Sequence, residues 1–135
     1  MAIKEDGFTL VEIMIVIIIL AVLTGVAVVS YLNFTPRAKE SRTEIEMRNI
    51  STALSVYSAD NNSYPLTADY PNDIETGGYM GNVPDDDAWD TAYQYVSSDG
   101  LSYTLESFGV DKVNGGGDDI VFTDGIMTED GAYSN

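Results

Sequence analysis

The chain has 135 residues, 44% of them hydrophobic, and its net charge of −16 comes from 6 basic and 22 acidic side chains. It contains neither histidine nor cysteine, which excludes imidazole or thiolate metal sites, cysteine nucleophiles and histidine-dependent triads. From Asp60 onward Lys112 is the single basic residue. We therefore expect no binding of nucleic acid, because the acidic surface would repel the phosphate backbone.

An apolar segment near the N-terminus approaches the length of a membrane span. Residues 13–29 read IMIVIIILAVLTGVAVV, and the flanking Phe8, Leu10 and Val11 extend the run toward the roughly 20 residues that a transmembrane helix needs. An ordinary secretory signal would be followed by a small-residue cleavage motif, and none follows here. Hydropathy alone is also consistent with an uncleaved signal anchor that holds a soluble head.

The junction between the polar N-terminus and the apolar run carries a specific motif. After the polar segment MAIKEDG, residues 7–12 read GFTLVE. This arrangement resembles the class III leader and processing site of type IV prepilins and pseudopilins. The resemblance implies that residues 1–7 are a leader peptide, that a membrane-embedded prepilin peptidase cleaves after Gly7, and that the new amine of Phe8 is methylated.

Glu12 places a carboxylate inside the apolar helix, which costs several kcal/mol unless the group is neutral or paired. One interpretation is a protonated or snorkelling acid near the membrane interface. The family resemblance implies instead that Glu12 meets the amine of Phe8 on a neighbouring subunit in a filament. That contact would offset the desolvation cost and set the axial register.

The helix is expected to continue beyond the membrane. Residues 8–36 form the predicted transmembrane and polymerisation helix, and residues 37–62 its amphipathic continuation. An apolar stripe at helical spacing predicts a seam against a sheet, with charged residues left in water. The stripe consists of Met47, Ile50, Leu54 and Tyr57. Residues 60–65, DNNSYP, end the helix, since Asn suits a C-terminal cap and Pro65 cannot continue it.

The predicted head comprises residues 37–135 and has an α+β composition. Residues 63–90 contain three glycines and scattered prolines and are expected to form a loop. The β-forming segments 91–97 and 101–107 flank the turn-like Ser98-Asp99-Gly100, which predicts a hairpin, and residues 120–122 form a possible third strand. Together they form a β-hairpin and acidic loop over 91–122. The tail, residues 123–135, is assigned only exposure.

These features together are similar to the major pseudopilin of type II secretion systems. The resemblance implies a type IV pilin fold, in which a long N-terminal helix packs on a small antiparallel sheet. Family members commonly have Asp-Pro-Trp-Gly where this chain has Asp87-Ala88-Trp89-Asp90, and a proline and a glycine where it has Val29 and Ala21. We expect Trp89 to be a core residue, with the loop around it altered in shape.

The segment from Phe108 to Asp119 is the candidate metal site. It presents three carboxylates around a glycine run, and such hard oxygen donors on a flexible loop suit Ca²⁺. The resemblance implies side-chain ligation by Asp111, Asp118 and Asp119, with the carbonyls of Phe108 and Gly116 as backbone ligands. A solvated turn is the alternative. Without disulfides, a bound cation would also stabilise the head.

The resemblance implies a structural role and no enzyme activity. The subunit would leave the inner membrane, with its head in the periplasm, and polymerise into a helical homo-oligomeric filament that exports folded proteins. Its implied partners are the prepilin peptidase, minor pseudopilins and an inner-membrane assembly platform. A surface type IV pilus is the nearest alternative. A membrane-anchored glycosidase would need paired carboxylates, and no segment of the sequence singles out such a pair. Electron transfer along aromatic residues is supported only by an aromatic content of 10%, which is ordinary.

Overall fold

A computed structural model describes residues 7–132 of the protein, and it describes residues 29, 30, 32 and 33 by their backbone alone. It comprises two helices and four strands. These are α1 (Leu10–Asn61), α2 (Asn72–Thr76), β1 (Gln94–Val96), β2 (Thr104–Ser107), β3 (Ile120–Thr123) and β4 (Ile126–Asp130). The chain divides into two compact units between Thr35 and Pro36, next to the boundary predicted from sequence.

The first unit is helical. Within it, Leu10–Val28 is the one stretch of the described chain long and apolar enough to cross a membrane, with a mean hydropathy of 2.9. The part of α1 that belongs to the second unit is amphipathic. Of the stripe predicted at helical spacing, Met47, Ile50 and Leu54 are fully buried, which confirms the prediction for them, and Tyr57 is half-buried. The helix ends at Asn61, and Asn62 follows in the left-handed conformation (φ 58°) expected of a C-terminal cap.

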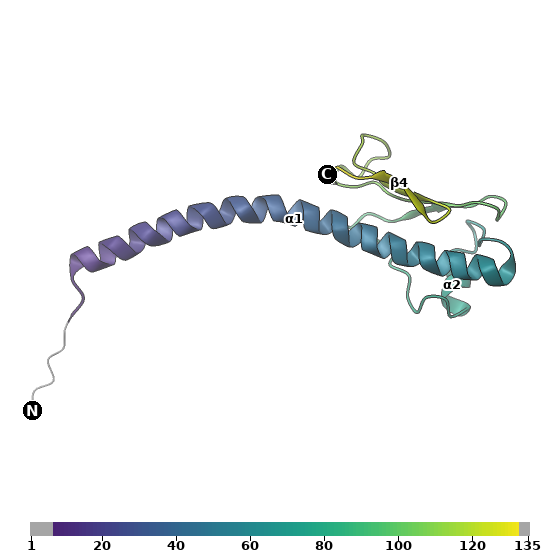
Figure 1. The fold of residues 1–135 in the computed structure, drawn as a ribbon, viewed down its shortest axis with the longest axis horizontal. Coiled ribbons are helices and arrows are strands. Elements are labelled where there is room, and N and C mark those ends of the chain that lie inside the picture. The colour runs from purple at the N-terminus through teal and green to yellow at the C-terminus, as the bar shows by residue number, and fades with distance from the viewer. Residues whose placement is uncertain (1–6, 133–135) are drawn as a thin grey trace, which may run out of the picture. The chain divides into compact units, whose positions relative to one another are not determined.

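The four strands form one antiparallel sheet in the order β1-β2-β3-β4, which lies along the C-terminal part of α1 (Figure 1). Tyr95 on β1 pairs with Leu105 on β2, which in turn pairs with Phe122 on β3, and all three side chains are buried. One face of the sheet therefore meets the apolar stripe of α1. The small antiparallel sheet and the long helix confirm the α+β pilin fold.

The head core is unusually rich in tyrosine. Tyr93, Tyr95 and Tyr103 are buried together with Trp89, and Tyr70 stacks on Tyr95 with 4.1 Å between ring centroids. These rings cover large areas with little rotamer entropy to lose, which suits a head that has no disulfide. The burial of Trp89 confirms the prediction that it is a core residue.

The structure differs from the sequence prediction in two places. Residues 63–90 are not loop throughout, because α2 forms at 72–76 and buries Ile74. Residues 123–135 are not merely an exposed tail, because β4 pairs with β3 through Ile120↔Asp130 and Thr123↔Ile126. Both elements are short, and β4 is exposed along most of its length, so neither leaves a hydrophobic period in the sequence.

The loop around Trp89 is held by one buried acid. Asp87 Oδ1 accepts hydrogen bonds from the backbone N–H groups of Trp89 (2.8 Å) and Thr91 (3.0 Å), and Oδ2 accepts from Ser107 Oγ (2.6 Å). Asp90 takes the left-handed conformation with φ 60°. The family resemblance implies glycine at this position, and glycine and aspartate both tolerate a positive φ, so both residues fit this turn.

This conformation predicts which substitutions Asp90 tolerates. Asp90→Gly should leave the free energy of unfolding within about 0.5 kcal/mol of the native value, whereas Asp90→Val should lower it by about 1–3 kcal/mol because a branched side chain is strained at this φ. Chemical denaturation of the detergent-solubilised chain measures both. Asp86→Val is the control, because Asp86 is exposed and has a negative φ. An equal loss of unfolding free energy in Asp86→Val would contradict the explanation.

Candidate functional site

The proposed processing site lies just ahead of the first helix. Gly7 and Phe8 have no regular structure, and α1 begins two residues later at Leu10. The Phe8 side chain is 79% exposed, and no atom outside its chain neighbours lies within 4 Å of the position that a Gly7 Cβ would take. Within the described residues, nothing packs over the Gly7–Phe8 junction.

Glu12 occupies the third residue of α1, and its backbone is part of an N-terminal cap. The Glu12 N–H donates to Thr9 Oγ1 (3.2 Å) and to the Thr9 carbonyl (3.1 Å), so Thr9 caps the helix. The sequence Thr-x-x-Glu is a capping-box pattern, a signal that was readable but not used in the prediction. The Glu12 carboxylate is exposed within this unit and is therefore available to a partner.

The surface next to Glu12 is apolar on every side. Within Leu10–Val28, none of the membrane-length window is buried by the rest of the chain. Side chains such as Ile13, Ile17 and Leu20 are all at least half exposed. A soluble protein rarely leaves such a continuous apolar surface uncovered, so this helix must be covered by lipid or by other protein.

The acidic loop brings two of its three predicted ligands together. Asp118 Oδ2 accepts the backbone N–H of Asp111 (2.8 Å), and Asp111 Oδ1 accepts that of Val113 (2.8 Å). The other oxygens, Asp111 Oδ2 and Asp118 Oδ1, lie 2.9 and 3.3 Å from where a Cβ on Gly116 would sit. Gly116 therefore leaves open the space on which the two carboxylates converge, and a larger residue would fill it.

Asp119 points elsewhere in the same loop. It is 3% exposed, its Oδ2 accepts the backbone N–H of Gly115 (2.6 Å), and its Oδ1 is buried with no hydrogen-bond partner. An unpaired buried carboxylate oxygen is costly, which is the condition that a cation would relieve. Within residues 7–132, however, no three acidic side chains lie close enough together to hold a metal ion as they stand.

Backbone conformation shapes this loop as much as its charges do. Gly109 and Gly116 both have positive φ, at 62° and 106°. A Cβ on Gly109 would collide with the Asp118 carbonyl, so the two ends of the loop pack backbone against backbone. Phe108, the predicted carbonyl ligand beside Gly109, is half-buried. The donor types and the close approach of the loop ends fit a hard cation such as Ca²⁺.

Two further acids face the loop and were missed from the sequence. The pKa of Glu106 on β2 is raised by burial and by the negative charges of Asp119 and Glu129. Glu106 and Glu129 pair with the same β3 residue, Val121, which brings them to one face of the sheet. Their strands are separate in sequence, so only the pairing register could reveal this cluster.

Two sequence families match this chain in succession. Residues 3–28 match the prokaryotic N-terminal methylation motif, and residues 30–123 match the family described as type II secretion system (T2SS), protein G. The chain belongs to the type II secretion system protein G family. The β4 strand lies beyond the residues that match the family.

Curated relatives of this family cover nearly the whole chain. Proteins named type II secretion system core protein G are 30% identical over 131 residues in Aeromonas hydrophila and 32% identical over 127 residues in Vibrio cholerae. These alignments cover 87% and 84% of this chain and 91% and 86% of the relatives. A third relative of the same name, from Pseudomonas aeruginosa, is 30% identical over 129 residues, which cover 85% of this chain and 90% of the relative. No solved structure matches the chain.

Proposed function

We propose that this protein is the major structural subunit of a type II secretion pseudopilus, a filament that helps move proteins across the outer membrane. The match of residues 30–123 to the protein G family carries the proposal, and the methylation motif over residues 3–28 supports processing as in pilins. Its role is to polymerise and not to catalyse. The relatives reported above share one name, type II secretion system core protein G, which favours this machine over a surface type IV pilus.

The apolar surface of Leu10–Val28 suggests how the subunit is stored and how it assembles. Before assembly, the bilayer covers this surface and the head lies in the periplasm, with the chain anchored in the inner membrane. In the filament, helices of neighbouring copies replace the lipid. The prepilin peptidase, minor pseudopilins and an inner-membrane assembly platform are the partners that this cycle requires.

The first expected outcome concerns processing. The mature protein should start at Phe8 with a methylated amine, because Gly7 is the small residue ahead of the apolar helix and none of the described residues packs over the bond after it. Mass spectrometry of purified filaments measures the N-terminus directly. Gly7→Leu is the matched variant, and it should remain uncleaved and unassembled. Intact MAIKEDG in assembled material would contradict the proposal.

The second expected outcome concerns the role of Glu12 in assembly. Glu12→Gln should insert normally but assemble poorly, since glutamine can still serve the helix cap yet cannot pair with the charged amine of Phe8 on a neighbour. Membrane fractionation measures insertion, and filament shearing measures assembly. Thr9→Ala is the control, because it removes the cap, at a cost of about 0.5–2 kcal/mol, and leaves the carboxylate. A normal filament yield from Glu12→Gln would rule out the pairing.

Calcium binding at the loop is a separate proposal. The convergence of Asp111 and Asp118 on Gly116 and the unpaired Oδ1 of Asp119 support it. Bringing all three carboxylates onto one ion requires Asp119 to give up its hydrogen bond to Gly115 or to use its free oxygen. A divalent cation would turn the repulsion among these charges into coordination, with Phe108 and Gly116 offering backbone carbonyls.

Thermal melting of the detergent-solubilised chain tests this proposal. Calcium at a hundredfold excess over its Kd should stabilise the folded head by about 2.7 kcal/mol, so chelator should lower the melting temperature by several degrees. Asp118→Ala should melt low with or without calcium. Asp69→Ala removes one exposed charge elsewhere and should keep the response to calcium. A melting curve that chelator leaves unchanged would mean that the loop is a solvated turn.

A further inference from the structure

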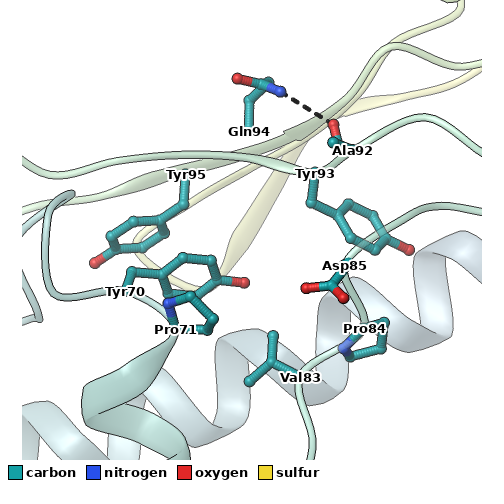
Figure 2. Close-up of a pocket in the computed structure, with 9 residues that line it drawn as sticks. All are labelled: Tyr70, Pro71, Val83, Pro84, Asp85, Ala92, Tyr93, Gln94 and Tyr95. Atoms are coloured by element: carbon teal, nitrogen blue, oxygen red, sulfur yellow. Dashed lines mark hydrogen bonds between the residues drawn. The ribbon is translucent and has the colours of Figure 1, made fainter.

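A pocket with aromatic walls and one acid lies between the segment around Tyr70 and the strand β1 (Figure 2). Its volume is about 340 Å³, enough for a long side chain. Tyr70, Tyr93 and Tyr95 supply the rings, Val83 is apolar, and Asp85 supplies the carboxylate. No residue of the pocket has a positive charge, and it belongs entirely to the head unit.

The tyrosine hydroxyls in this pocket are not equivalent. Tyr93 donates to Glu46 Oε2 (3.0 Å) and Tyr95 donates to the Pro65 carbonyl (2.7 Å), so both hydroxyls are satisfied inside the head. The Tyr70 hydroxyl is buried with no hydrogen-bond partner among the described residues. Leaving such a group unpaired is unfavourable, so a ligand that forms a hydrogen bond to it removes that cost.

Asp85 faces the same space. Figure 2 shows its carboxylate and the Tyr70 hydroxyl pointing toward one another, and no hydrogen bond or ion pair of the carboxylate is found within residues 7–132. Burial, together with the charges of Asp85 and then Glu75, raises the pKa of Tyr70, so the hydroxyl stays neutral. The pocket thus offers two oxygen acceptors in a negative field beside stacked rings. A guanidinium matches this set, since it donates in a fork and stacks on aromatic faces.

None of the three arginines lines this pocket, and they differ in the partners that their side chains have. Arg42 pairs with Glu46 (2.8 Å), and Arg48 lies over the Phe122 ring, 5.8 Å from its centroid. Arg37 is exposed and, of the three arginines, is the one for which no hydrogen bond, ion pair or ring contact is found among residues 7–132. In a filament, copies that each carry a charge of −16 repel one another. A contact between the Arg37 guanidinium of one copy and the acidic pocket of the next would oppose this repulsion, because the two groups have opposite charge.

We propose that this pocket receives the Arg37 side chain of a second copy of the chain, with the guanidinium bridging Tyr70 Oη and the Asp85 carboxylate. The contact is head-to-tail, because Arg37 and the pocket are different surfaces of one subunit, and such a contact propagates into a filament. This inference rests on the proposed function, since it names one contact by which subunits associate. It differs from the Phe8–Glu12 contact, which would lie in the apolar part of α1.

Cysteine crosslinking in cells tests the contact, because the chain has no cysteine of its own. One full-length copy carries Ser41→Cys, one helical turn after Arg37, and a differently tagged copy carries Gln94→Cys at the pocket; both positions are exposed. A short bis-maleimide should join them into a mixed dimer. Arg37→Asp on the first copy should abolish that dimer, and adding Asp85→Arg on the second should restore it.

The controls separate this inference from the proposed function. Asp86→Arg makes the same charge change one residue outside the pocket and should neither abolish nor restore the dimer, and Ser98→Cys in place of Gln94→Cys should not crosslink. Filaments that form while Arg37→Asp leaves the crosslink intact would overturn the inference alone. Loss of export with an unchanged crosslink in Asp85→Arg would assign the pocket to an exported protein and also overturn it. A wild-type chain that never forms filaments with its secretion system would overturn the proposed function instead.

Discussion

The apolar surface of Leu10–Val28 is the constraint on which the rest of the molecule depends. Nothing in the described chain buries it, although it is as apolar as a membrane span. Burial of this surface is favourable by about 25 cal/mol per Å² of apolar surface. Covering this helix with lipid or with other protein is therefore strongly favoured. An acid on such a surface is costly unless it has a partner or loses its charge, which is the physical ground for the pairing proposed for Glu12.

The head meets a different requirement, because it must hold a fold with no disulfide and with many like charges. Several of its acids act as local backbone acceptors, as Asp87 does for Trp89 and Thr91 and as Asp119 does for Gly115. Each such hydrogen bond holds a turn in one conformation without a covalent crosslink. The acids that remain free, among them Asp85, give the surface a negative field, so cationic partners are favoured over anionic ones.

The strand β4 extends the sheet by one strand beyond the region that matches the family. It covers the free edge of β3, and the Gly131 N–H donates to the carbonyl of Asp119, next to the acidic loop. A Cβ on Gly131 would press against the carboxyl group of the buried Glu40 on α1, so the chain passes close to the helix at this point. The end of the chain thus ties the loop, the sheet and the helix of the head together, and it removes one exposed sheet edge from the core strands.

The amino-acid sequence by itself determined the elements that depend on local patterns. The apolar run, the GFTLVE motif, the stripe from Met47 to Tyr57, the Asn cap and the hairpin are all periodic or short-range signals, and the structure contains the corresponding elements. The family also followed from these motifs.

Tertiary structure alone decided which distant groups meet. The Tyr70–Asp85 pocket, the cluster of Glu106 with Glu129, the strand β4 and the separation of Asp119 from Asp111 and Asp118 all depend on strand register and on backbone turns at glycines. Partners in such contacts are chosen by how the chain packs, and residues far apart in sequence carry no local period that would mark them as neighbours.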